Sequence, residues 1–317
     1  MDDSPLAAAP ARKFSDPDTT AKGERRAHVD FAGLRTLWVN TGTLCNITCA
    51  HCYIESSPHN YRLAYFRLAD LVRYLDEIAA NEWPTQEVGF TGGEPFMNPD
   101  ILAMIETALV RGFHVLVLTN AMRPMRRHKS ALLDLLRRYG DRLVIRVSLD
   151  HPTAACHDEE RGAGGFAATL AGLKWLSDSG FATRVAGRTL WGGGAEDLRR
   201  DYAALFGREG IRVDASDAEQ LVLFPEMDAA AEVPEITEHC WDILHVSPSD
   251  MMCASSRMVV RRRDAEAPAV LACTLLPYDP QFELGGTLAG ASQAVKLNHP
   301  HCAKFCVLGG GSCSRGG

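Results

Sequence analysis

Short apolar runs alternate with longer amphipathic stretches between residues 34 and 224 of this chain. Runs rich in β-branched and apolar residues predict strands, and apolar positions three and four residues apart predict helices. The predicted strands cover residues 34–40, 87–90, 115–119, 143–149, 182–189 and 221–224. Because strands that alternate with helices form parallel sheets, the pattern predicts about six β/α units, arranged as a partial (β/α)6 barrel of the TIM type.

The helical stretches between these strands each have one apolar face. The clearest predicted helix carries Leu68, Leu71, Val72, Leu75 and Ile78 on one side. After the second strand, Asn98 is the predicted N-cap of a helix with Pro99 in its first turn, since both residues favour those positions. Further predicted helices cover residues 130–139, 166–176 and 196–206.

The pattern is absent at both ends of the chain. Residues 1–32 mix Asp, Pro, Ala, Lys and Arg without an apolar segment, so we expect a disordered tail rather than a signal peptide or an anchor. From His239 onward the alternation stops and cysteines become frequent. We therefore predict a domain boundary near Pro234, between a barrel domain (33–234) and a small C-terminal domain (235–317).

Composition narrows the class of protein. The chain has 317 residues and a net charge of −7, which argues against a nucleic-acid partner because phosphate binding needs clustered Lys and Arg. No window approaches the roughly 18 apolar residues of a membrane span, so no membrane partner is expected. Ten cysteines without a secretory signal indicate metal ligation in a reducing compartment, and therefore a cytoplasmic protein.

Three cysteines follow the first predicted strand in the segment Cys45-Asn-Ile-Thr-Cys49-Ala-His-Cys52-Tyr53. They would lie on one loop at the carboxyl end of the strand, where β/α barrels build their sites. Three thiolates hold three corners of a [4Fe–4S] cube and leave the fourth iron open, whereas a structural zinc site would be closed by a fourth ligand. The alternative is zinc with His51 as that ligand, which would strain the loop.

The spacing CxxxCxxC followed by an aromatic residue resembles the signature of the radical S-adenosylmethionine (SAM) superfamily. Thr91-Gly92-Gly93-Glu94-Pro95, after the second strand, resembles the GGEP element of that family. The resemblance implies a [4Fe–4S] cluster on Cys45, Cys49 and Cys52, and SAM bound to the open iron. It also implies that Gly92, Gly93 and Glu94 contact the amino group of SAM.

Further segments resemble family elements and imply other SAM contacts. Ser148 belongs to a Ser-Leu-Asp sequence and Arg161 to His157-Asp-Glu-Glu-Arg-Gly, as in members with a SPASM or twitch domain, where both residues help to bind SAM. Asn120 follows Thr119 as in the family's T-N-G element, although Ala121 replaces the glycine. Tyr53 would lie near the adenine, with plain packing as the alternative.

The C-terminal cysteines resemble a shortened SPASM or twitch domain, which holds an auxiliary iron–sulfur cluster. A predicted hairpin (258–262 and 269–272) lies between Cys253 and Cys273, and a second group follows at Cys302, Cys306 and Cys313. Two complete cubes would need about eight cysteine ligands, so the resemblance implies one auxiliary [4Fe–4S] cluster, on Cys253, Cys273, Cys302 and Cys306 with Cys313 as substitute. The alternative is a zinc-stapled lid. Cys156 and Cys240 are interpreted as ordinary thiols.

The resemblance implies an enzyme that cleaves SAM reductively to methionine and a 5′-deoxyadenosyl radical, which abstracts hydrogen from a substrate. Many peptide-modifying relatives carry an additional N-terminal domain that binds a leader peptide, so the short tail here favours a small-molecule substrate. An external reductant such as flavodoxin or ferredoxin is expected. Three alternatives stay open: a peptide-modifying maturase, transfer of the 3-amino-3-carboxypropyl group of SAM, and a non-catalytic iron–sulfur carrier or zinc scaffold.

Overall fold

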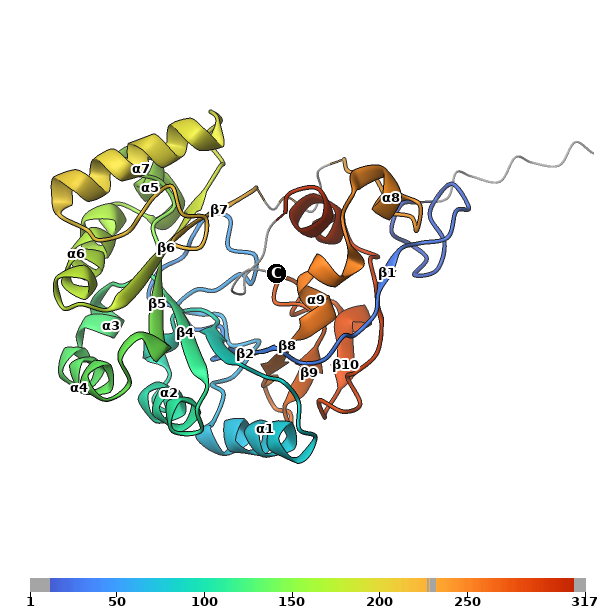
Figure 1. Ribbon diagram of the computed structural model, residues 1–317, viewed down its shortest axis with the longest axis horizontal. Coiled ribbons are helices and arrows are strands. Elements are labelled where there is room, and N and C mark those ends of the chain that lie inside the picture. Colours follow the sequence, from blue (N-terminus) through green and yellow to red (C-terminus); the bar gives the residue numbers. More distant parts are fainter. Residues whose placement is uncertain (1–11, 227, 229–231, 311–317) are drawn as a thin grey trace, which may run out of the picture.

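A computed structural model describes residues 12–226, 228 and 232–310, and its centre is a curved sheet (Figure 1). Over the described residues, this sheet has nine strands in the order β10-β9-β8-β2-β3-β4-β5-β6-β7. Neighbouring strands from β2 to β7 are all parallel. They are β2 (Thr36–Asn40), β3 (Glu87–Thr91), β4 (His114–Thr119), β5 (Leu143–Ser148), β6 (Ala182–Arg188) and β7 (Leu221–Phe224). The predicted partial β/α barrel is confirmed.

Helices cover the outer face of the barrel strands (Figure 1). They are α1 (Leu68–Ala80), α2 (Ile101–Val110), α3 (Arg123–Arg126), α4 (Lys129–Tyr139), α5 (Ala154–Arg161), α6 (Gly165–Asp178) and α7 (Ala195–Glu209). Their apolar faces pack on alternate strand residues such as Val88 and Val117 in one large core. Each fully buried side chain of this kind contributes about 1.5–3 kcal/mol.

The opposite face of the same strands points into the barrel. Trp38, Leu116 and Val144 lie on this inner face, each one residue out of step with the outer core, as the two-residue period of a strand requires. Gly89 faces the Trp38 ring, and a Cβ atom there would lie 2.5 Å from it. The glycine therefore allows a fully buried indole to fill the barrel just below the carboxyl ends of the strands.

The start of α2 differs from the prediction. Asn98 is not the N-cap; a short 3-10 turn (Pro95–Met97) precedes it and the helix begins at Ile101, after Asp100. The Asn98 side chain instead donates to the carbonyls of Thr41 and Phe66, both at 2.9 Å. Its side-chain oxygen accepts from the Asp100 N–H at 2.8 Å, so Asn98 caps the turn before the helix while its amide group serves two buried backbone oxygens.

The predicted disordered tail is wrong for residues 12–32. Strand β1 (His28–Val29) pairs antiparallel with β11 (Val295–Lys296), and the Ala27 N–H donates to the Ile236 carbonyl. Residues 1–11 lie outside the described residues. The partners of this segment are more than 200 residues away in sequence, so no local pattern could reveal the order.

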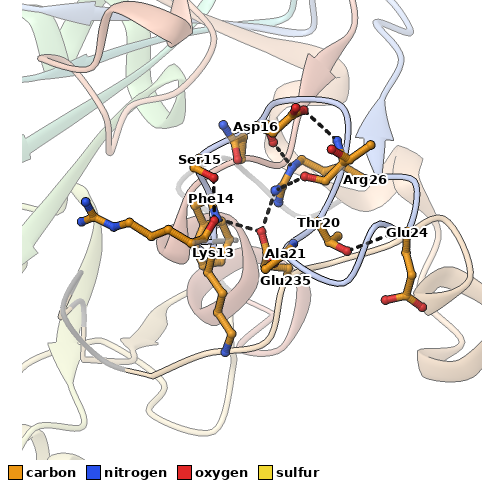
Figure 2. Close-up of polar contacts among 12 residues, drawn as sticks. Lys13, Phe14, Ser15, Asp16, Thr20, Ala21, Glu24, Arg26 and Glu235 are labelled. Carbon is orange, nitrogen blue, oxygen red and sulfur yellow. Dashed lines mark hydrogen bonds and ion pairs between the residues drawn. The ribbon is translucent and has the colours of Figure 1, made fainter. Parts of the chain in front are cut away.

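A buried ion pair fixes the same segment (Figure 2). The Arg26 guanidinium donates to the Glu235 carboxylate at 2.6 Å and has no exposed surface. The same carboxylate accepts from the N–H groups of Phe14 at 2.8 Å and Ala21 at 2.7 Å. Glu235 lies in the chain that follows the barrel, so this pair ties the N-terminal segment to the C-terminal part.

The C-terminal part extends the barrel sheet. It contains α8 (Cys240–Leu244), α9 (Met252–Ser255), β8 (Ser256–Val260), β9 (Ala269–Leu271), β10 (Glu283–Gly285) and a π-helical segment (Cys302–Val307). The predicted hairpin is confirmed as the antiparallel pair β8–β9. Strand β8 also pairs parallel with β2, so the sheet is continuous across the proposed boundary near Pro234. Over the described residues, no helix is long and apolar enough to cross a bilayer.

Candidate active site

The cysteine loop lies at the carboxyl ends of the barrel strands, as predicted. Cys45, Cys49 and Cys52 follow β2 and line a cavity of about 1030 Å³, counted to its open mouth. The loop is held from both sides: the Cys45 N–H donates to the Ser57 carbonyl at 3.1 Å, and the Ala50 N–H donates to the Glu160 carbonyl at 2.9 Å. Three thiols therefore face one cavity from a fixed backbone.

The thiols lie in a setting that disfavours their ionised form. Burial raises the pKa of Cys45 to about 12 and that of Cys49 to about 11, with Arg161 acting in the opposite direction at Cys49. A thiolate here needs a nearby cation, and the irons of a cluster supply it, since metal ions deprotonate the thiols that ligate them. The donor set fits an iron–sulfur cluster.

His51 does not join the three thiols. Its Nδ1 lies 2.7 Å from one Glu160 oxygen, and its backbone N–H donates to the other at 2.9 Å. Among the residues that the structure describes, no three His, Cys, Asp or Glu side chains meet closely enough to hold a single metal ion. The side chain that the zinc alternative needs as its fourth ligand is held by Glu160.

Two glycines bring the next strand end against the cysteine loop. Gly92 adopts φ +132°, and a Cβ atom there would lie 2.6 Å from the Gly42 carbonyl oxygen. A Cβ atom at Gly93 would lie 2.2 Å from the Leu44 carbonyl oxygen. Both glycines line the cavity, so close packing on the loop is a second reason for them besides the predicted backbone contact with SAM.

Glu94 lies behind the cavity rather than in its lining. Its carboxylate accepts from Thr119 Oγ1 at 2.8 and 3.0 Å, from the Asn120 N–H at 2.9 Å and from the Phe96 N–H at 3.1 Å. Burial raises the pKa of Glu94 to about 7. The structure therefore places Glu94 where it aligns the end of β4, and the direct contact with the SAM amino group stays a prediction.

We expect Glu94→Gln to lower the free energy of unfolding by about 1–3 kcal/mol. Every group around the carboxylate is a donor, so a Gln amide would face N–H or O–H groups with its own N–H groups. Chemical denaturation of the apo protein measures the effect, and the exposed Glu196→Gln is the matched control. Unchanged stability combined with weaker SAM binding would instead favour direct contact with SAM.

The other predicted SAM contacts line the cavity: Tyr53, Asn120, Ser148 and Arg161. The Asn120 amide donates to Asn46 Oδ1 at 2.9 Å and so holds the cysteine loop from a third strand end. Ala121, which stands where the family has glycine, adopts φ +57°. The backbone takes the left-handed turn that favours glycine, despite the Cβ atom of Ala121.

Arg161 is held by a carboxylate that the sequence analysis did not select. Its Nε and Nη2 donate to the two Asp150 oxygens at 2.5 and 2.9 Å. Burial alone would raise the pKa of Asp150, but Arg161 lowers it below its usual value. The Asp150 N–H donates to His157 Nδ1 at 3.2 Å. The Asp150 carboxylate thus orients one edge of the Arg161 guanidinium, and the other N–H groups of Arg161 are left for the cavity that it lines.

Glu160 and Arg188 are two further site residues that were missed. Glu160 accepts from Arg188 Nη1 at 2.8 Å in addition to its two bonds with His51. Arg188 lies at the end of β6 and, like Glu160, lines the cavity. The sequence held a signal for each residue. Glu160 directly precedes Arg161, and Arg188 lies near the end of a predicted strand, where β/α barrels build their sites.

The C-terminal cysteines gather beside the cavity. Burial raises the pKa of Cys302 well above its usual range, and the nearby Cys273 and Cys253 thiols add to the effect. Cys306, four residues after Cys302 in the π-helical segment, packs on the same apolar cluster. Cys313 lies outside the described residues. Four thiols in an apolar setting fit an auxiliary cluster, by the same argument about charge as at the barrel site.

This thiol group adjoins the active-site cavity. Leu275 and Phe305 line the cavity, two residues after Cys273 and one before Cys306. Cys240 begins α8 and packs on the same apolar cluster; its thiol accepts from the Thr237 N–H at 3.3 Å, and its interpretation as an ordinary thiol stays a prediction.

Comparisons with known proteins agree with this geometry. AlbA, an antilisterial bacteriocin subtilosin biosynthesis protein of Bacillus subtilis (strain 168), is 36% identical over 143 residues, which are 45% of this chain and 30% of AlbA. The mycofactocin maturase MftC of Mycobacterium ulcerans (strain Agy99) is 29% identical over 167 residues, which are 52% of this chain and 42% of MftC. The chain therefore spans less than half the length of either curated relative.

Solved structures share the fold. Streptococcus suis SuiB bound to S-adenosylmethionine has a TM-score of 0.58 at 13% identity, over 80% of this chain and 63% of SuiB. The protein anSMEcpe with bound AdoMet has a TM-score of 0.56 at 14% identity, over 81% of this chain and 77% of that one.

A protein-family model matches the part of the chain that carries the site. The model of the radical SAM superfamily covers residues 39–206, which include the cysteine loop, the Gly-Gly turn, Ser148 and Arg161. The cofactors of this family are a [4Fe–4S] cluster and SAM. Because the match extends over more than half of the sequence, the chain belongs to the radical SAM superfamily.

Proposed function

We propose that this protein is an enzyme that cleaves SAM reductively and abstracts hydrogen from a substrate in the cavity beside the cysteine loop. The observation that carries the proposal is the convergence on one cavity of three thiols, the Gly-Gly turn, Ser148 and Arg161. When bound, the cluster and SAM supply an electron and a 5′-deoxyadenosyl radical that takes a hydrogen atom from the substrate.

The chain's own residues then bind and orient. Cys45, Cys49 and Cys52 would hold three irons of the cluster, and the backbone at Gly92 and Gly93 would approach the ligand closely because no Cβ atom intervenes. Arg161, oriented by Asp150, would bind the SAM carboxylate through its free edge. Phe224, Leu275 and Phe305 form an apolar wall that would exclude water from the reacting groups.

The test is an anaerobic assay of reconstituted protein with SAM and dithionite. We expect 5′-deoxyadenosine and methionine as products. Release of 5′-methylthioadenosine would mean that another sulfur–carbon bond breaks, and would favour transfer of the 3-amino-3-carboxypropyl group. Intact SAM in a fully iron-loaded protein would favour the non-catalytic carrier or scaffold.

We propose a small molecule as the substrate. SAM would share the cavity beside the cysteine loop with the substrate, and Phe224, Leu275 and Phe305 form its apolar wall, so the space left suits a compact group. A flavodoxin- or ferredoxin-type reductant would deliver the electron. We also propose a cytoplasmic location, since thiol ligands stay reduced there.

A peptide is the second candidate substrate. SuiB was also solved bound to its precursor peptide SuiA, with a TM-score of 0.55 at 12% identity, and MftC is a maturase. A single residue of a peptide would also fit the space. Comparison of 5′-deoxyadenosine yield with peptides and small molecules encoded or made near the gene separates the two candidates.

A further inference from the structure

Arg257 is a buried cation without a carboxylate partner. It lies in β8, and 1% of its surface is exposed. Its guanidinium donates only to backbone carbonyls: those of Ala291 and Gln293, both at 2.9 Å, Cys253 at 2.6 Å and Ser256 at 2.7 Å. Its guanidinium also lies 4.2 Å over the Phe31 ring, but none of the described carboxylates forms an ion pair with it.

Four other arginines with little exposed side-chain surface have a carboxylate beside them. Arg26 pairs with Glu235, Arg161 with Asp150, Arg188 with Glu160 and Arg261 with Asp70. A buried charge that lacks an opposite charge costs several kcal/mol. The guanidinium is therefore placed to meet a negative charge that the protein side chains alone do not supply.

Ligation of a cluster by Cys253 would bring a negative charge close to Arg257. The guanidinium bonds to the carbonyl of that residue, and Cys253 is the first of the four thiols that fit the auxiliary cluster. Four thiolates outweigh the positive charge of an oxidised [4Fe–4S] core, so the ligated cluster is an anion. Reduction by one electron makes it more negative, and nearby charge is one of the factors that set the potential of a cluster.

We propose that Arg257 is the counter-charge of the auxiliary cluster and raises its reduction potential. This inference rests on the auxiliary cluster of the proposed function. The cation stabilises the reduced cluster more than the oxidised one, because the reduced form carries one more negative charge. The cluster thereby becomes a better acceptor of a single electron. Arg257 acts through the cluster and is a positioning residue rather than a catalytic one.

The test is a redox titration followed by electron paramagnetic resonance. It is made in the Cys45, Cys49 and Cys52 triple-alanine variant, so that the signal comes from the auxiliary cluster alone. We expect Arg257→Gln to lower the equilibrium constant for one-electron reduction at least tenfold, a fall of about 59 mV in the potential. Arg257→Lys keeps the charge and should stay near the parent value.

Arg261→Gln is the matched control, since it removes a neighbouring buried arginine that already has a carboxylate partner. A purely structural role of Arg257 would lower stability and leave the potential unchanged, which would overturn the proposal. An apo Arg257→Gln protein that does not fold would also overturn the proposal. A folded apo variant that no longer retains the cluster would support it, because the anion then lacks its counter-charge.

The iron content separates this inference from the proposed function. A triple-alanine parent without iron would overturn the auxiliary cluster itself, before Arg257 is changed. A parent with iron and an unchanged potential in Arg257→Gln would overturn only the role of Arg257.

Discussion

Replacement of Cys45, Cys49 and Cys52 by Ala is expected to abolish SAM cleavage and to leave about four iron per chain. The three thiols are the proposed protein ligands of the SAM-binding cluster, and without them no open iron is available. The C-terminal thiols lie on other elements and retain their own partners. The measurements are 5′-deoxyadenosine formation with dithionite, and iron and sulfide content after anaerobic reconstitution.

Cys156→Ala is the control, because this thiol is also free and belongs to neither group. It should keep both activity and iron. Loss of all iron in the triple variant, with the apo chain still folded, would remove the auxiliary cluster from the proposal. Residual 5′-deoxyadenosine formation would show that these cysteines do not hold the SAM-binding cluster.

The barrel could be predicted because its strands and helices carry their own patterns. Strand β7 coincides with the predicted run 221–224, and α4 begins one residue before the predicted start. Each of these helices buries one face, and the strands are largely buried. Their apolar residues therefore recur with the period of a helix or a strand, which can be recognised in the sequence. The start of α2 could not be predicted in this way, since the Asn98 side chain serves two carbonyls from distant parts of the chain.

The N-terminal segment shows a second limit of pattern analysis. Its order depends on one buried pair, Arg26 with Glu235, and on a two-residue strand. Charged residues in a polar stretch look solvated in the sequence, and only the fold brings the opposite charge to them. Pattern analysis could not place β8 beside β2 either, because the two strands are more than 200 residues apart in the sequence.

The site residues also fall into two groups: those that the sequence indicates and those that only the fold brings together. Cys45, Gly92 and Ser148 could be selected because each belongs to a segment that resembles a family motif, and each lies at or after the end of a parallel strand, where the strands share one edge. Their supporting residues could not. Asp150 and Glu160 lie in the selected segments, but only the structure shows that Asp150 pairs with Arg161 and Glu160 with Arg188. Glu94 was selected by its motif, and its position aligns the end of β4.

Wild-type protein reconstituted without oxygen is expected to hold about eight iron and eight sulfide per chain, and replacement of Cys253 and Cys273 by Ala should reduce both to about four. The barrel thiols and the C-terminal thiols are separate sets that each support one cube. SAM should still change the electron paramagnetic resonance signal of the remaining cluster, since the open iron belongs to the barrel site. Metal analysis and spectra with and without SAM measure both effects.

Cys240→Ala is the control for that variant, because its thiol contacts Thr237 and lies outside the preferred ligand set. It should keep eight iron. Separate replacement of Cys306 and Cys313 identifies the fourth ligand, since only the true ligand lowers the iron content. A wild-type chain with about four iron and one zinc would make the C-terminal site a structural lid. An electron-accepting cluster, and with it the role of Arg257, would then be excluded, while SAM cleavage at the barrel site would be unaffected.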